Sequence, residues 1–263
     1  MTADDLVQAS RRLAWGCRQL RFSPQVRHVY HALLYARAPH EAYLRMYGAT
    51  PKTVVFLGMN PGPWGMAQTG IPFGEVEIVR DWLLVSGAVR EPSGTHRRVP
   101  VRGFSCSRSE VSGRRLWGLM RDRFGSPGAF FADHFVANYC PLLFLDAQGR
   151  NITPDKIPTT DRAPLERLCD AHVVRIAEAL RPKWMVGVGR FAERRLTAIA
   201  SEHGWRDIRI ASIPHPSPAS PKANRDWAGD VIRVLCGLGI WATEDVSRED
   251  PPRERSPSRR QSR

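Results

Sequence analysis

Short apolar runs alternate with longer segments of helical periodicity along most of this chain, and this alternation most limits its possible folds. The runs span five or six residues each, at residues 53–58, 134–138, 184–188 and 208–213. Continuous apolar runs of this length are typical of strands buried on both faces. Helical patterns follow at residues 75–87, 163–181, 191–202 and 222–237. We therefore predict an α/β fold with a short, mostly parallel four-stranded sheet, covered by helices on both faces.

The rest of the chain predicts one domain and one tail. Residues 4–47 contain two helical segments that we expect to cover the sheet, and residues 142–145 continue the apolar stretch of the second strand. A chain of 263 residues is long enough for one compact core, or at most two small ones. We predict a single domain at residues 1–243. Residues 244–263 are rich in Arg, Ser and Pro, a composition typical of disorder.

An excess of positive charge indicates a polyanionic partner. The formal net charge is +13 at pH 7, which favours nucleic acid first and an anionic membrane second. A charge that serves only solubility is the alternative. Residues 90–115 are interpreted either as a solvated loop or as a loop that contacts phosphates. Their basic residues are Arg90, Arg97, Arg98, Arg102, Arg108, Arg114 and Arg115.

The cysteines and the apolar runs argue against several other classes of protein. The five Cys are scattered and include no Cys-x-x-Cys pair, so we expect neither a disulfide framework nor a zinc ribbon. Cysteines used as small buried side chains fit a reducing compartment. No apolar run approaches the roughly 18 residues that span a bilayer, and the N-terminus has no secretion signal. We therefore predict an intracellular protein with no membrane partner.

Two loops that follow predicted strands carry residues suited to chemistry, and ligands bind beyond the carboxyl ends of strands in open parallel sheets. The first loop runs from Gly58 to Glu75 and contains five Gly and three Pro, which let its backbone approach a ligand closely. Asn60 can donate and accept hydrogen bonds. Phe73 offers a flat apolar face to a base. The alternatives are an Asn that caps its own turn and a Phe that packs in the core.

The second loop begins at His215 and ends at Pro221. Three Pro among its seven residues make it stiff. A His at its start can hold a hydrogen bond or a charge beside a reacting group. The loop leads into a helix whose N-terminus, near Lys222, can receive a phosphate. A structural His beside a rigid turn is the alternative.

Taken together, these loops resemble those of the single-strand-selective monofunctional uracil-DNA glycosylases, a branch of the uracil-DNA glycosylase superfamily. The resemblance covers about residues 25–240. It rests first on Gly58-Met59-Asn60-Pro61-Gly62-Pro63, Pro72-Phe73-Gly74-Glu75 and His215-Pro216-Ser217-Pro218. Asn138-Tyr139-Cys140-Pro141, residues 149–154 and Val186-Gly187-Val188-Gly189-Arg190 add to it. The resemblance implies a three-layer α/β/α sandwich and a DNA-repair enzyme that initiates base excision repair.

The resemblance also implies roles for individual residues. Asn60 would orient the attacking water, and His215 would stabilise the charge that builds on uracil O2 as the base departs. Phe73 would stack on the flipped base, Asn138 would read the edge of the pyrimidine, and the backbone at Met59 would touch the base. These residue types suit the reaction, because a hydrogen-bond donor aimed at a developing anion stabilises the transition state selectively. An Asn is no strong base, so we expect slower hydrolysis than in a relative with Asp.

Gly62 bears on substrate choice. The most selective uracil glycosylases carry a bulky Tyr at the corresponding place, which excludes the methyl group of thymine. Gly leaves that space open, so we expect 5-substituted uracils such as 5-hydroxymethyluracil to be accepted. The alternative is a Gly that merely permits the turn.

The target base must leave the stack before it reacts. The predicted DNA contacts are Ser217, Pro218 and Ala219 of the second loop, with Lys222 and Arg225 of the following helix. Relatives carry an Arg where this chain has Ala219. The residue that fills the gap is therefore left open between Arg225 and an arginine of residues 90–115.

The first loop lacks Lys, and Lys222 is the only one near the second. A Schiff-base lyase needs a Lys at the sugar, so we predict a monofunctional hydrolase without metal or cofactor. We expect a monomer that acts on single- and double-stranded DNA, in the nucleus of a eukaryote or in the cytoplasm and nucleoid of a bacterium. Two alternatives are an iron–sulfur glycosylase, which needs four suitably placed Cys, and a non-catalytic DNA-binding module.

Overall fold

A four-stranded parallel sheet forms the centre of the molecule. The computed structural model describes residues 3–218 and 223–243. The strands β2 (Val54–Gly58), β3 (His134–Asn138), β6 (Trp184–Val188) and β7 (Arg209–Ile213) lie in the order β3-β2-β6-β7. All three neighbouring pairs are parallel. The predicted sheet is confirmed, with strand boundaries that differ from the prediction by at most one residue.

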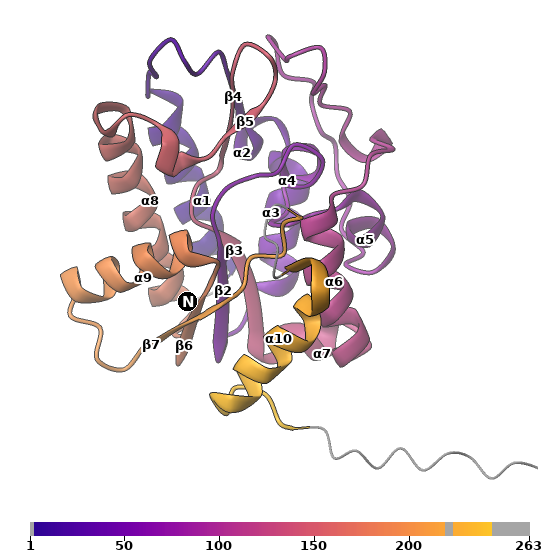
Figure 1. Ribbon diagram of the computed structural model, residues 1–263, viewed down its shortest axis with the longest axis vertical. Coiled ribbons are helices and arrows are strands. Elements are labelled where there is room, and N and C mark those ends of the chain that lie inside the picture. Colours follow the sequence, from indigo (N-terminus) through magenta and orange to yellow (C-terminus); the bar gives the residue numbers. More distant parts are fainter. Residues whose placement is uncertain (1–2, 219–222, 244–263) are drawn as a thin grey trace, which may run out of the picture.

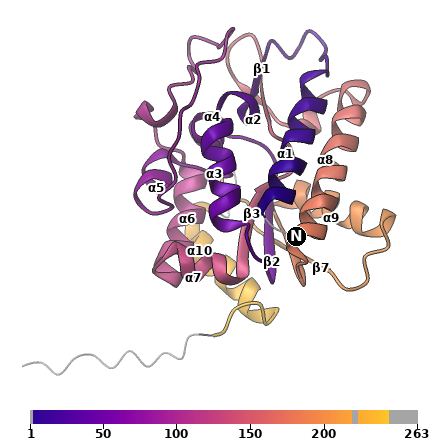
Figure 2. The ribbon, with the colours of Figure 1, turned by 180° about the vertical axis from the view of Figure 1, so that it is seen from behind.

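Helices cover this sheet on both faces, as Figures 1 and 2 show. On one side lie α1 (Ala3–Arg18), α3 (Arg37–Tyr47), α8 (Thr159–Leu180) and α9 (Arg190–Glu202). On the other lie α6 (Val111–Phe124), α7 (Pro127–Asp133) and α10 (Ala223–Gly237). The short helices α4 (Met66–Thr69) and α5 (Val76–Asp81) follow β2. The predicted three-layer α/β/α sandwich is therefore confirmed.

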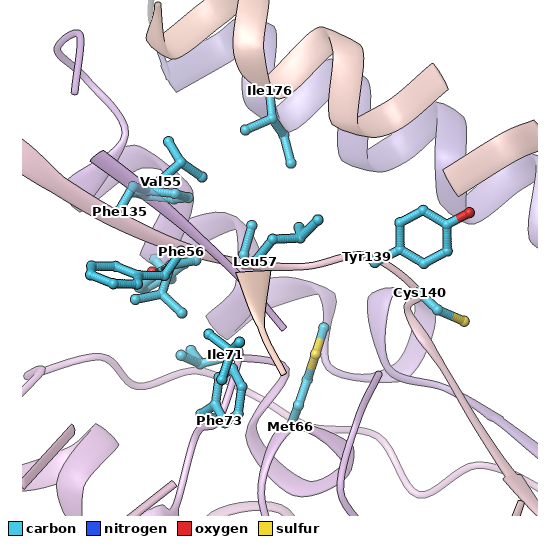
Figure 3. Close-up of a cluster of buried hydrophobic side chains, with 14 of the residues drawn as sticks. Val55, Phe56, Leu57, Met66, Ile71, Phe73, Phe135, Tyr139, Cys140 and Ile176 are labelled. Carbon is cyan, nitrogen blue, oxygen red and sulfur yellow. Dashed lines mark hydrogen bonds between the residues drawn. The ribbon is translucent and has the colours of Figure 1, made fainter. Parts of the chain in front are cut away.

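The core fills both spaces between the sheet and its helices. Successive side chains of a strand point to opposite faces, and every residue of β2 is buried. Figure 3 shows Val55 on the side of α8 with Ile176, and Phe56 on the opposite side with Ile71. Most of the buried hydrophobic side chains of the described residues belong to one core cluster. This explains why β2 is apolar throughout instead of alternating.

A second, antiparallel sheet was not predicted. The strands β1 (His28–His31), β4 (Leu142–Leu145) and β5 (Asn151–Ile152) pair in the order β1-β4-β5. The helical prediction across 4–47 is thus wrong at β1, which precedes the short α2 (Ala32–Tyr35). Pairing with β4 holds this segment extended, against its helical pattern. β4 belongs to this sheet and does not prolong β3.

Helix α6 corrects the interpretation of residues 90–115 as a loop. The segment contains a turn of 3-10 helix, η1 (Gly103–Ser105), and its last five residues already belong to α6. A second such turn, η2 (Pro154–Lys156), precedes α8. The predicted tail at 244–263 lies outside the described residues. Among the helices of the described ranges, none combines the length and the apolar character needed to cross a bilayer.

Candidate active site

A cavity of about 330 Å³ lies at the carboxyl ends of the parallel strands. Segments far apart in the sequence line it, namely the loop after β2, the end of β3, the residues around β5, the start of α6 and the loop after β7. The lining residues are Met59, Asn60, Pro61, Gly62, Pro63, Phe73, Glu110, Ser112, Asn138, Asn151, Thr153, His215 and Ser217.

The cavity brings together most of the residues singled out from the sequence. The two predicted catalytic residues and all four predicted base contacts line it, and Ser217 does so as well. Pro218 and Arg225 are exposed and do not line it. Ala219 and Lys222 lie outside the described residues. The sequence interpretation missed the cavity residues at the start of α6 and around β5, above all Glu110, which directly precedes α6.

Strand pairing sets the position of Asn60 and Asn138. Gly58 is opposite Asn138 in the parallel register, and Cys140 N–H donates to the Met59 carbonyl at 2.8 Å beyond the strand ends. The chain then turns into β4, where the Leu142 carbonyl accepts a hydrogen bond of 3.2 Å from Asn60 Nδ2. A carbonyl can only accept, so it fixes which end of the amide faces it. Oδ1 of Asn60 is left available to a ligand.

Gly58 allows Asn138 and Phe73 to meet at the cavity floor. A Cβ at this position would collide with Asn138 Oδ1 and with the Phe73 ring. Asn138 is 8% exposed, and its Oδ1 is buried without a hydrogen-bond partner in the described part of the chain. Buried polar atoms are rarely left unpaired. This oxygen is therefore available to accept a hydrogen bond from a ligand.

The backbone on either side of Phe73 is held by hydrogen bonds from Trp117 and Thr69. Phe73 has a φ of 53°, a conformation that non-glycine residues seldom adopt. Trp117 of α6 donates to the Pro72 carbonyl at 3.1 Å, and Thr69 Oγ1 donates to the Gly74 carbonyl at 2.9 Å. The ring itself is buried and lies 6.2 Å from the His215 ring, centroid to centroid.

The protonation state of His215 follows from its surroundings. Ser217 N–H donates to His215 Nδ1 at 3.1 Å. Because Nδ1 accepts, the proton of the neutral ring is on Nε2. Burial lowers the pKa of His215 below its ordinary value. The side chain is thus a neutral imidazole with a fixed Nε2–H donor.

Contacts from two helices hold the loop that carries His215. Arg115 of α6 donates to the Pro216 carbonyl at 2.9 Å and to Asn224 Oδ1 at 3.0 Å. Trp227 of α10 donates to the Pro214 carbonyl at 2.8 Å. One arginine from residues 90–115 therefore positions the second loop, a role that neither sequence-based alternative included.

Glu110 corrects the interpretation of Gly62 as the edge of an open space. A Cβ at Gly62 would collide with Glu110 Oε1, and a Cβ at Gly65 would collide with Oε2. The space over Gly62 is occupied by this carboxyl group. Burial and the charge of Glu75 raise the pKa of Glu110 to about 7. A single Glu in a polar stretch gives no local signal, and the two glycines are the only sequence hint.

A second cavity of about 240 Å³ is lined by Trp64, Arg98, Pro100, Arg102, Cys106, Ser107 and Arg108. The Arg108 guanidinium stacks on Trp64, 3.9 Å from the ring centroid. Gln68 joins this region to the first loop, because its side chain donates to the Pro63 and Pro100 carbonyls and accepts from Arg102 N–H. The three arginines are exposed, so their charges are available to an anionic partner.

The iron–sulfur alternative finds no ligand set in the described ranges, which include all five cysteines. The cysteines are free, and four of them are buried. No three side chains of the His, Cys, Asp and Glu type gather there in an arrangement suited to a metal ion.

Comparisons with known proteins identify related sequences and folds. The sequence model of the Uracil DNA glycosylase superfamily matches residues 46–235. A Bos taurus protein named single-strand selective monofunctional uracil DNA glycosylase is 47% identical over 239 residues, covering 90% of this chain and 87% of that protein. Its Rattus norvegicus counterpart is 45% identical over 242 residues, covering 90% and 85%. The crystal structure of wild-type Pedobacter heparinus SMUG2 is similar with a TM-score of 0.64 at 19% identity, covering 92% of this chain and 100% of that one.

Proposed function

Because this chain belongs to the uracil DNA glycosylase superfamily, we propose that it hydrolyses the bond between base and deoxyribose at uracil and 5-substituted uracils in DNA. Its membership confirms the resemblance carried by the two loops. The observation that supports the reaction most directly is the meeting of Asn60, Phe73, Asn138 and His215 around one cavity. A volume of about 330 Å³ lies in the range of small-molecule sites.

In this proposal His215 stabilises the departing base. Cleavage leaves negative charge on the pyrimidine, and a fixed donor beside O2 stabilises that charge more than it stabilises the substrate. The hydrogen bond from Ser217 N–H supports this role, because it leaves the proton on Nε2. A neutral imidazole serves here as a donor without having to transfer its proton.

Asn60 orients the water that attacks the sugar. Its Nδ2 is anchored on the Leu142 carbonyl, so Oδ1 can accept a hydrogen bond from the water. An amide does not take up the water proton at neutral pH. The reaction therefore depends on the departure of a stabilised base and on a well-placed water.

Phe73 and Asn138 select the base. The Phe73 ring supplies a stacking surface, a contact worth about 1–3 kcal/mol per base. The unpaired Oδ1 of Asn138 suits the N3–H of uracil, and its amide group suits the neighbouring O4. Cytosine presents an acceptor at N3 and a donor at C4, so it would oppose both groups.

The cavity favours simple hydrolysis, since none of the described residues that line it is a lysine.

DNA contacts are proposed around the mouth of the cavity. Among the residues that the structure describes, these contacts are Ser217, Pro218 and Arg225. Met59 contacts the base through its backbone. Exposed Arg98, Arg102 and Arg108 supply charge for phosphates. In this account residues 1–243 act as one domain, which the hydrophobic core cluster supports. We further propose that the protein acts as a monomer in the compartment that holds the genome.

An oligonucleotide with a single uracil and an end label tests the proposal. After incubation with the protein, hot alkali should break the strand at the uracil, in both single-stranded and duplex DNA. The same oligonucleotide without alkali should stay intact, because a hydrolase leaves the abasic sugar in place. Binding without any alkali-sensitive site would instead support the non-catalytic DNA-binding module.

A further inference from the structure

The second cavity is bounded by two segments that also bound the first cavity. In the first loop, Pro63 lines the first cavity and Trp64 lines the second. In the segment before α6, Glu110 lines the first cavity and Arg108 lines the second. Consecutive α-carbons are about 3.8 Å apart, so the two cavities are neighbours. A DNA strand whose target base lies in the first cavity can therefore extend across the second.

Buried hydrogen bonds hold the walls of the second cavity in place. Gln68 of α4 is fully buried. Its side chain donates to the Pro63 carbonyl at 2.8 Å and to the Pro100 carbonyl at 3.0 Å, and it accepts from Arg102 N–H at 2.8 Å. Figure 1 shows the segment between α5 and α6 beside α4, to which Gln68 ties it. The cavity is thus formed before any ligand arrives.

The charge of the second cavity is not neutralised within the protein. Its three arginines are exposed, and the described residues that line it include no Asp or Glu. Within the described ranges, no carboxylate forms an ion pair with any of the three. Another group of three arginines differs, because Arg11, Arg37 and Arg45 all bind Glu41. A group of uncompensated positive charges attracts an anion.

A stacking surface accompanies this charge. Trp64 is partly buried and packs against the core, which fixes the plane of its ring. The Arg108 guanidinium stacks on it, 3.9 Å from the ring centroid. Unpaired bases stack on aromatic rings and on guanidinium planes. A phosphate alone would need only the charges, so the ring indicates a ligand that also carries a base.

We infer that the second cavity binds an unpaired nucleotide that flanks the target nucleotide in the same DNA strand. Its base stacks against the pair formed by Trp64 and Arg108, and Arg98 and Arg102 neutralise its phosphate. This inference rests on the proposed function, because the occupant is a neighbour of the extruded nucleotide. A base that is paired and stacked inside a duplex is not free to enter, so the contact forms only where the flanking nucleotide is unpaired.

A double-mutant cycle between protein and DNA tests the inference. The single-stranded oligonucleotides carry a deoxyuridine whose 2′-fluorine slows hydrolysis, and in each of them one flanking nucleotide is replaced by a tetrahydrofuran residue without a base. Kd is measured by fluorescence anisotropy for the parent and for Trp64→Leu. We expect Trp64→Leu to raise Kd about 5- to 150-fold on the intact strand. At one flanking position, loss of the base should raise the parent's Kd similarly and should abolish the effect of Trp64→Leu.

Three controls accompany the cycle. Trp15 of α1 is 63% exposed, with the Arg18 guanidinium 5.7 Å from its ring centroid, and it is not among the described residues that line either cavity. Trp15→Leu should therefore leave Kd unchanged. On a duplex with paired flanking bases, Trp64→Leu should also change Kd little. Arg102→Gln should lower the slope of log Kd against log salt concentration by about 0.7 on the single strand.

The remaining outcomes are decisive as well. Trp64→Leu overturns the inference if its effect persists at every base-free position, or if it weakens duplex binding as much as single-strand binding. An unchanged salt slope in Arg102→Gln overturns the phosphate contact. If Trp64→Leu fails to fold, Arg108→Ala replaces an exposed residue and should show the same coupling, whose absence overturns the inference. A parent that cleaves no uracil oligonucleotide refutes the proposed function itself, whereas cleavage without coupling refutes only the flanking site.

Discussion

The raised pKa of Glu110 predicts a specific dependence of stability on pH. A carboxyl group with a folded pKa of about 7 and an unfolded value near 4.3 binds its proton more tightly in the folded state. The free energy of unfolding therefore includes a contribution that is complete below the unfolded pKa and is lost as pH rises through 7. A shift of this size corresponds to about 4 kcal/mol over the whole titration.

Glu110→Gln removes this titration and keeps the shape of the side chain. We expect its free energy of unfolding, relative to the parent, to rise by about 3 kcal/mol between pH 4.5 and pH 8.5. Urea unfolding at several pH values, followed by circular dichroism, measures this difference. Glu91→Gln removes an exposed carboxylate as a control and should follow the parent. A constant difference between Glu110→Gln and the parent would refute a raised pKa.

Three further results follow from the site. Phe73→Ala should lower kcat/KM on uracil about 5- to 150-fold through lost stacking, and a loss of less than twofold in steady-state assays would argue against stacking. Arg115→Ala removes a hydrogen bond that holds the loop carrying His215. We expect kcat to fall at least about tenfold while the melting temperature changes little. An unchanged kcat would contradict the positioning role of Arg115. Because burial lowers the pKa of His215 and the neutral form is the donor, the pH–rate profile should lose activity only below about pH 6.5. A midpoint above that value would contradict the neutral imidazole.

The parallel sheet was predictable because its signal is local. β2 and β6 are buried at every position, so each appears in the sequence as an unbroken apolar run. β1 gave no such signal, because only Tyr30 of its four residues is buried. Its extended form depends on pairing with β4, more than a hundred residues later. Partners that distant in sequence leave no periodicity to detect.

Helix α6 was missed for a different reason. It contains Gly113 and Gly118, which are poor helix formers. A Cβ at Gly113 would collide with the Phe73 carbonyl, so this glycine serves the packing of α6 against the first loop. The tertiary contact outweighs the low helix propensity of glycine at this position. A single sequence does not reveal such a contact.

The candidate site was predictable to the extent that its residues lie in unusual loops. Asn60 and Phe73 lie in a stretch rich in Gly and Pro, and His215 lies in a stretch rich in Pro. The topology of parallel strands brings such loops to one edge of the sheet. Glu110 comes from the loop before α6, so its place could not be read from its neighbours in sequence. The sequence singled out Gly62 as a position without a side chain. The structure explains the missing side chain, because the carboxyl group of Glu110 occupies the space that a Cβ would need.

The central claim is that Asn60 and His215 act on one nucleotide in the cavity. Single-turnover cleavage of a uracil oligonucleotide by Asn60→Ala and by His215→Leu, with DNA affinity measured in parallel, tests it most directly. Each variant should cleave about 100- to 1,000-fold more slowly while its Kd for DNA stays within a few-fold of the parent. Unchanged cleavage rates, or affinity that falls as far as cleavage does, would contradict the claim.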